Sequence, residues 1–377
     1  MAASHPTQEP LLLPLASDRA TLPLAGGKGA NLARLVRAGF PVPHGFVIST
    51  EAYASFVAAN DLARHILSEL EAEGRAADLS GGEAHEATSS RIRARFSEAT
   101  MPASFRDQIL AAYAGLGRPP VAVRSSATAE DLPDMSFAGQ QDTFLNVIGD
   151  EALLAAVTAC WSSLWTARAI SYREHNRVSH GDVSIAVVVQ KMVQSEAAGV
   201  LFTANPLTGL RTETVIDATL GLGEALVGGR VQPDHYVVDR CTGQITSRAL
   251  GAKVLSIRGK DGGGTETVAE SAAATQALPD AQILELAALG DRVAGMFDAP
   301  QDIEWAWADS ALSLLQARPI TSLFPVPPGL DPEPLRVMLS FGAVQGMLDP
   351  VTPLGRDLFF HLVVAVGQLF GMALRPE

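Results

Sequence analysis

Apolar runs of strand length and stretches with helical periodicity share this 377-residue chain. Val121 to Val123 is a short β-branched run, and Val183 to Val193 is nearly all apolar, as in strands buried within a sheet. Gly199 to Thr203 follows so closely that we predict a hairpin between it and the preceding run. Helical periodicity marks residues 51–116, 151–175 and 279–297. The pattern therefore predicts an α+β protein.

A second predicted hairpin pairs residues 302–308 with residues 312–320, where apolar and polar positions alternate on both sides of a turn. With this turn near residue 310, Glu304 faces Gln316 and Asp302 lies near Arg318. One face then carries two acids, an amide and a guanidinium. Oxygens of Glu304 and Gln316 suit Mg²⁺, and Arg318 could pair with phosphate charge. A cross-strand salt bridge at a sheet edge is the alternative interpretation.

Two further segments have the chemistry of phosphate binding. Arg124 follows the first apolar run and precedes small hydroxyl residues, so a bidentate cation is followed by flexible donors. Residues 25–31 form a predicted glycine loop that contains Lys28, and it leads into a predicted helix over residues 32–38. A helix N-terminus with a nearby lysine can bind phosphate, although the P-loop pattern is absent.

Composition narrows the class of protein. Hydrophobic residues make up 47% and charged residues 18%, as in globular proteins. The formal net charge of -13 argues against a large nucleic-acid interface. Cys160 and Cys241 are far apart and fit a reducing cytoplasm, and the first ten residues resemble no signal peptide. The apolar tail from Phe359 to Leu374 is too short and too polar for a membrane span. We therefore expect a cytoplasmic protein.

Five ordered stretches resemble motifs of one superfamily, that of pyruvate, water dikinase (phosphoenolpyruvate synthase), pyruvate phosphate dikinase and rifampicin phosphotransferase. The resemblance covers roughly residues 15–322. The stretches are GGKGANLARLVRAGFPVPHGFVIST, RSSATAEDLPDMSFAGQQDTFLNV, AGVLFTANPLTG, GLGEALVGGRVQPDHYVVDR, and the hairpin DIEWAWA with LSLLQARPI. The stretch GLGEAL superficially suggests the dinucleotide-binding fingerprint G-x-G-x-x-G. Leu226 stands where that fingerprint has its third glycine, so the motif is rejected.

The resemblance implies an ATP-grasp-like, two-lobed nucleotide-binding domain that uses ATP and Mg²⁺. Its lobes would span residues 1–120 and 121–322. Catalytic roles are implied for Arg124 and Arg318, and metal binding for Glu304 and Gln316. The implied nucleotide-binding residues are Lys28, Arg124, Gly139, Gln190, Met192, Val193, Thr203, Asp302, Glu304, Gln316 and Arg318. Residues 190–193 are the candidate adenine contact, Thr203 would lie near the phosphates, and Met192 has a competing interpretation as core filler.

The implied reaction passes the β- and γ-phosphates of ATP to a histidine on a separate domain, releases AMP, and then phosphorylates a small-molecule acceptor. None of the eight histidines matches the phosphohistidine motif, so we expect the chain alone to be incomplete. A linker is expected over residues 323–334, and residues 335–377 resemble the start of an acceptor domain. A rifamycin-like molecule and pyruvate both remain open as acceptors. The alternatives are an ATP-binding subunit that needs a histidine-bearing partner, and an inactive fragment.

Overall fold

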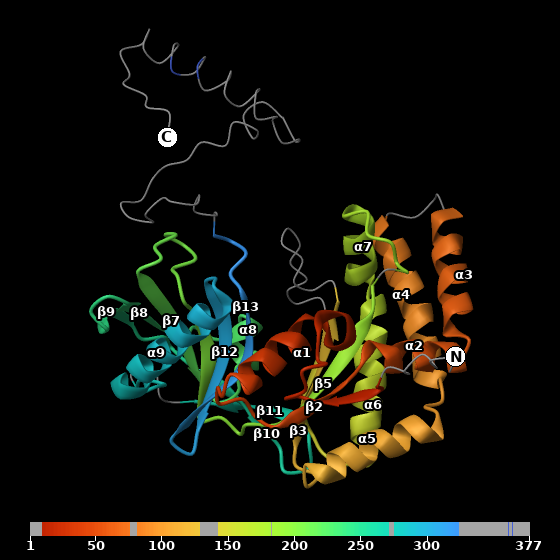
Figure 1. The fold of residues 1–377 in the computed structure, drawn as a ribbon, viewed down its shortest axis with the longest axis horizontal. Helices are drawn as coiled ribbons and strands as arrows, with labels where there is room; N and C mark the ends of the chain where they lie inside the picture. The colour runs from red at the N-terminus through yellow and green to blue at the C-terminus, as the bar shows by residue number, and fades with distance from the viewer. Residues whose placement is uncertain are drawn as a thin grey trace, which may run out of the picture. The chain divides into compact units, whose positions relative to one another are not determined.

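The computed structural model describes residues 10–75, 81–128, 142–181, 183–270 and 275–323, together with residues 361 and 364. The chain divides into two compact units, Met1–Pro325 and Val326–Glu377. The first unit mixes helices and sheets (Figure 1), as the sequence pattern predicts. The predicted linker after residue 323 and the predicted acceptor segment lie outside the described residues, apart from those two isolated positions.

The first sheet is antiparallel and has the strand order β1-β2-β5-β3-β4. Its strands are β1 (Leu12–Pro14), β2 (Gly45–Ile48), β3 (Val121–Ala127), β4 (Thr143–Val147) and β5 (Ile185–Lys191). The β-branched runs that predicted buried strands form β3 and β5, and nearly every position of both is buried. Strands from both sides of residue 120 share this sheet, so the predicted lobe boundary at that residue falls inside it.

The second sheet is also antiparallel, with the order β13-β12-β6-β7-β8-β9. Its strands are β6 (Ala197–Phe202), β7 (Glu213–Leu220), β8 (Asp234–Asp239), β9 (Gln244–Ala249), β12 (Gln301–Ala308) and β13 (Ala311–Pro319). A separate two-stranded hairpin consists of β10 (Leu255–Gly259) and β11 (Thr265–Ala269). The predicted hairpin of β12 and β13 is confirmed, with Glu304 opposite Gln316 and Asp302 opposite Arg318.

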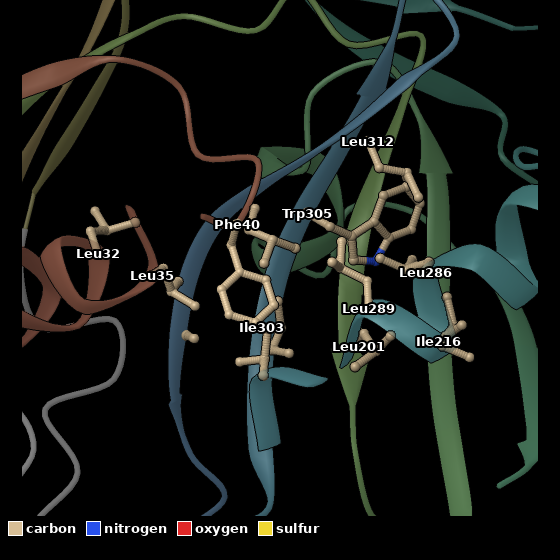
Figure 2. Close-up of a cluster of buried hydrophobic side chains, with 14 of the residues drawn as sticks. Leu32, Leu35, Phe40, Leu201, Ile216, Leu286, Leu289, Ile303, Trp305 and Leu312 are labelled. Carbon is tan, nitrogen blue, oxygen red and sulfur yellow. The ribbon is translucent and has the colours of Figure 1, made fainter. Parts of the chain in front are cut away.

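Helices cover both sheets. They are α1 (Leu22–Arg37), α2 (Thr50–Ala59), α3 (Leu62–Arg75), α4 (Gly81–Glu98), α5 (Ala103–Gly115), α6 (Asp150–Ser162), the 3₁₀ helix η1 (Ser163–Trp165), α7 (Ala167–His175), α8 (Glu224–Val227) and α9 (Asp280–Phe297). Helices α2 and α6 contact the first sheet, and α9 packs on the second (Figure 1). Figure 2 shows one hydrophobic cluster in which Leu32 and Leu35 of α1 lie on one side, Leu286 of α9 lies on the other, and Ile303 and Trp305 of β12 lie between them. Helix α1 therefore packs against the core of the second sheet as well as that of the first.

Two local predictions are wrong. Strands β5 and β6 do not form a hairpin: β5 pairs with β2 and β3, whereas β6 pairs with β12 and β7. Residues 192–196 thus carry the chain from one sheet to the other. Helix α1 begins at Leu22, with a proline in its first turn, rather than after the glycines. Its backbone breaks only at Gly26, where φ is 66°.

One stretch, Asp150–His175, is long and apolar enough to cross a membrane by length and composition, among the residues that the structure describes. However, 61% of its most apolar window is buried inside the protein, as in the core helices of globular proteins. Trp161 and Trp165 lie in this stretch, and both are buried in the core.

Candidate nucleotide site

A cavity of about 340 Å³ lies between the two sheets, at the segment that links them. The first sheet provides residues of β3, β4 and β5, the second provides residues of β6, β12 and β13, and the linking segment together with α8 and its flanking residues completes the wall. The lining residues are Ala122, Arg124, Thr143, Leu145, Gln190, Lys191, Met192, Val193, Ser195, Ala198, Gly199, Leu222, Gly223, Glu224, Val227, Gly228, Glu304, Trp305 and Leu315. We call the part at Arg124 and Glu304 the polar end of the cavity, and the part lined by the packed residues Leu145, Met192 and Leu222 the apolar end.

Arg124 links the two sheets at the polar end. Its strand, β3, is buried on both faces, and only 8% of the residue is exposed. One amino group donates to the carbonyl oxygen of Leu315 at 2.7 Å, and the other donates to Gln316 Oε1 at 3.0 Å and to the Glu304 carboxylate. A planar guanidinium can serve several acceptors in this way, which a lysine ammonium cannot reproduce. Arg124 is therefore held by acceptors that all come from the other sheet.

The hairpin of β12 and β13 supplies these acceptors because its register is irregular. Glu304 pairs with Gln316 but Trp305 pairs with Leu314, so Leu315 is an extra residue, a β-bulge. The bulge brings Leu315 into the cavity wall, while Trp305 is fully buried. Beyond it, Arg318 donates to the Asp302 carboxylate through Nε at 2.8 Å and through a terminal amino group at 2.7 Å.

The two acids on this face differ in proton affinity. Burial raises the pKa of the Glu304 carboxyl, but the charges of Arg124, Lys28 and Arg318 outweigh it and hold this pKa below its usual range. For Asp302 burial is the larger effect, so its pKa is raised in spite of Arg318. Glu304 is thus an ionised carboxylate close to three cations, as suits a group that faces phosphates or a metal ion.

Lys28 owes its position to the break in α1. A Cβ at Gly26 would lie 2.0 Å from the backbone oxygen of Ser126, so only glycine permits this approach of α1 to β3. The Ser126 hydroxyl donates to the Ala25 carbonyl at 2.7 Å and accepts from the Gly29 amide at 3.0 Å. The segment after the break is thereby fixed to β3, and Lys28 lies near enough to Glu304 to lower its pKa.

The apolar end contains the predicted adenine contact. Gln190, Met192 and Val193 all line the cavity. The amides of Lys191 and Met192 donate to the His44 and Pro120 carbonyls, at 2.8 and 2.9 Å. Within the described part of the chain, Val193 is the first residue of this stretch whose amide has no acceptor. That amide is therefore available to a ligand.

Other predicted residues lie elsewhere. Thr203 is fully buried, accepts from the Gln301 amide at 2.7 Å, and is not among the described residues that line the cavity. Its proposed place near the phosphates stays a prediction without support from this geometry. Gly139 lies outside the described residues. Sequence reasoning missed Leu145, Leu222 and Glu224, although all three fall inside the matched motifs.

The side-chain oxygens of Glu304 and Gln316 fit a magnesium ion, which also binds phosphate and water, better than a metal ion that protein side chains alone coordinate. Among the described residues, no group of three or more His, Cys, Asp or Glu side chains could hold a metal. Glu304 and Gln316 instead direct one carboxylate and one amide oxygen at the same nitrogen of Arg124, so the two oxygens converge. Mg²⁺ uses few protein oxygens and completes its shell with phosphate and water.

Known proteins resemble this chain over most of its length. Residues 22–325 match the family model described as pyruvate phosphate dikinase, AMP/ATP-binding domain. A rifampicin phosphotransferase of Streptomyces sviceus is 44% identical over 94% of this chain and 41% of its own length, and one of Bacillus subtilis is 41% identical over 92% and 40%. A probable phosphoenolpyruvate synthase of Archaeoglobus fulgidus is 42% identical over 81% of this chain and 41% of its own length. The chain spans about two fifths of the length of these relatives. It belongs to the family of the pyruvate phosphate dikinase AMP/ATP-binding domain.

Proposed function

We propose that this chain binds Mg·ATP in the cavity between its sheets and presents the β- and γ-phosphates for transfer to a histidine of another domain. Arg124 carries the proposal, because it is a buried cation that lines the cavity and gathers an acid, an amide and a carbonyl from the other sheet. A buried, multiply bonded guanidinium at one end of a mostly apolar cavity is a strong recognition element for phosphate. On this proposal the two sheets are the lobes of an ATP-grasp-like domain.

The base would occupy the apolar end. Adenine offers an acceptor and an amino donor on one edge, and the linking segment offers the Val193 amide with carbonyls beside it. Leu145, Met192 and Leu222 provide apolar surface for the faces of the ring. The triphosphate would then extend towards Arg124 and Glu304, with Lys28 and Arg318 nearby. The cavity volume is within the range of small-molecule sites.

Glu304 and Gln316 would hold the magnesium ion, which when bound offsets the negative charge of the phosphates. The low pKa of Glu304 keeps its carboxylate ionised for this purpose. Arg124 must then share its acceptors with the ion, and its freed amino groups could turn to the phosphates. Arg318 stays bound to Asp302 and adds positive charge on the same face of the hairpin.

In the full reaction a histidine nitrogen attacks the β-phosphorus of ATP, and the bond from this phosphorus to the oxygen shared with the α-phosphate breaks. AMP leaves with that oxygen, and the histidine carries both transferred phosphates until water attacks the γ-phosphorus. The bond between the β- and γ-phosphates then breaks, inorganic phosphate leaves, and the β-phosphoryl stays on the histidine for transfer to the acceptor. The final acceptor is a small molecule, rifamycin-like or pyruvate, in keeping with the names of the relatives. The histidine and most of the acceptor site would be supplied by domains beyond this chain, in the same protein or in a partner.

Calorimetric titration with ATP tests the proposal, with and without Mg²⁺, on the wild type and on Glu304→Gln. We expect saturable binding that magnesium strengthens in the wild type, and a much weaker magnesium effect in the variant. Unchanged circular dichroism would show that the variant is folded. No binding by the folded wild type would refute an autonomous nucleotide site, and full magnesium dependence in the variant would place the ion elsewhere.

A further inference from the structure

Asn146 is an unusual residue at the edge of the first sheet. It belongs to β4, whose one partner strand among the described residues is β3, and the register of that pair shifts beside it. Its φ is 55°, in the left-handed region, and only 1% of the residue is exposed. Asparagine adopts this conformation more readily than most residues, but a buried position still needs partners for the amide group. All of these partners lie in other parts of the fold.

Asn146 binds the turn of the β10–β11 hairpin. Its Nδ2 donates to the carbonyl oxygens of Lys260 and Gly264, both at 2.8 Å, and its own carbonyl accepts from the Gly264 amide at 2.9 Å. Its Oδ1 accepts from Gln194 Nε2 at 2.9 Å. Gly259 allows this packing, since a Cβ there would lie 2.6 Å from Gln194 Oε1 and 3.0 Å from the Asn146 side chain. One amide thus joins the first sheet, the hairpin and the linking segment.

The other side of the hairpin is attached to the end of the second sheet. Ile257 of β10 forms a bridge with Gly221, and its carbonyl accepts from the Leu222 amide at 2.8 Å. Arg230, which follows α8, donates to Thr267 of β11 at 3.0 Å. The hairpin therefore runs from the second sheet to Asn146 of the first, beside the segment that connects the two.

This connection borders the cavity. Leu145, the neighbour of Asn146, and Met192, two residues before Gln194, both line the cavity and pack in one cluster with Leu222 and Ile257. Both walls of the apolar end and the segment between them are therefore fixed, directly or through one residue, to the same amide group. A change in that group alters the spacing of the walls without touching a ligand.

We propose that Asn146 is a positioning residue for nucleotide binding: through the β10–β11 hairpin and Gln194 it holds the two walls of the cavity at the separation that fits the base. The nucleotide part of this inference rests on the function proposed above. Without the amide, the walls populate wider arrangements, and the apparent dissociation constant equals the intrinsic constant divided by the fraction of chains that remain competent to bind. A competent fraction of one tenth raises the dissociation constant for ATP about tenfold, equivalent to about 1.4 kcal/mol.

The test uses Asn146→Gly, which removes the side-chain bonds while glycine keeps the left-handed backbone. Asn205→Gly is the matched control. Asn205 is also mostly buried, and it bonds Leu207, Thr208 and Glu213 in a loop that does not line the cavity. We expect the ATP dissociation constant to rise about tenfold in Asn146→Gly and less than twofold in Asn205→Gly. Equal affinities in the two folded variants would overturn the proposal.

Hydrogen exchange without nucleotide separates this inference from the proposed function. Asn146→Gly should speed amide exchange in residues 192–196 and 255–269, and Asn205→Gly should leave both segments unchanged. Gln194→Ala, at an exposed position, serves if Asn146→Gly does not fold, and it should speed exchange in residues 192–196. Absence of any change in these segments would refute the connection even if ATP binds. Faster exchange in Asn146→Gly, together with no ATP binding by the wild type, would support the connection and reject the nucleotide proposal.

Discussion

Replacing Arg124 by lysine should harm both the fold and the site, although the charge is kept. The guanidinium reaches three acceptors on β12 and β13, at 2.7 Å for the Leu315 carbonyl and 3.0 Å for Gln316, with the Glu304 carboxylate as the third. A lysine ammonium can reach the carboxylate but cannot span all three acceptors. A hydrogen bond from a charged group contributes about 1.5–3 kcal/mol, so we expect the free energy of unfolding to fall by about 2 kcal/mol.

Urea unfolding and calorimetric ATP titration measure the two effects. The ATP dissociation constant should rise at least about tenfold, because one charged contact to phosphate is lost. Arg118→Lys is the matched control: its ion pair with Asp150, at 3.1 Å, is largely exposed, and such pairs contribute about 0–1 kcal/mol. The reasoning fails if folded Arg124→Lys has an unfolding free energy within about 0.5 kcal/mol of the wild type and an ATP affinity within twofold.

Three other predictions concern charged groups of the same unit. Arg318→Ala should weaken Mg·ATP binding about tenfold by calorimetry, and an unchanged constant would remove this side chain from the phosphate site. Lys253 and Asp234 form a fully buried ion pair, so Lys253→Met should lower the free energy of unfolding in urea by about 3–5 kcal/mol, and a loss below about 1 kcal/mol would contradict this. Burial, and then Arg173, lowers the pKa of His180 from 6.5 to about 4. The unfolded chain takes up a proton near pH 6.5 and the folded chain only near pH 4. As the pH falls from 6.5 to 4, the free energy of unfolding should therefore decrease by about 2–3 kcal/mol in the wild type, and by less in His180→Asn. If the wild type and His180→Asn show equal slopes of unfolding free energy against pH in that range, His180 is not the group responsible.

Local periodicity was enough to predict the hairpin that carries Glu304 and Gln316. Strict alternation on both sides of a short turn leaves one register that buries Ile303 and Trp305, and this register sets the polar pairs opposite each other. The bulge at Leu315 could not be predicted, because a single inserted residue barely disturbs a short alternating pattern. Its role depends on Arg124, which is distant in sequence.

Interactions between distant segments account for the errors. The short segment over residues 192–196 has the length of a hairpin loop, and nothing local indicates that β5 and β6 join different sheets. The proline at the start of α1 was a usable signal for an earlier helix start, but the glycines masked it. Thr203 could not be placed from the sequence, because a small polar residue after a strand can equally face a ligand or bond a neighbouring strand. In the structure its hydroxyl accepts from the Gln301 amide.

The division of strands between the sheets has a consequence for folding. In the part of the chain that the structure describes, the strands up to β5 belong to the first sheet, and β6 to β9 with β12 and β13 form the second. The chain passes from the one to the other at residues 192–196. Arg124 comes from before this crossing and its acceptors from after it. The site therefore exists only when the two halves are docked, and a ligand that binds there stabilises the docked state by RT ln(1 + [L]/Kd). Bound nucleotide would then hold the two halves of the chain together. This stabilisation would matter most for a chain cut within residues 192–196, whose halves are no longer covalently joined.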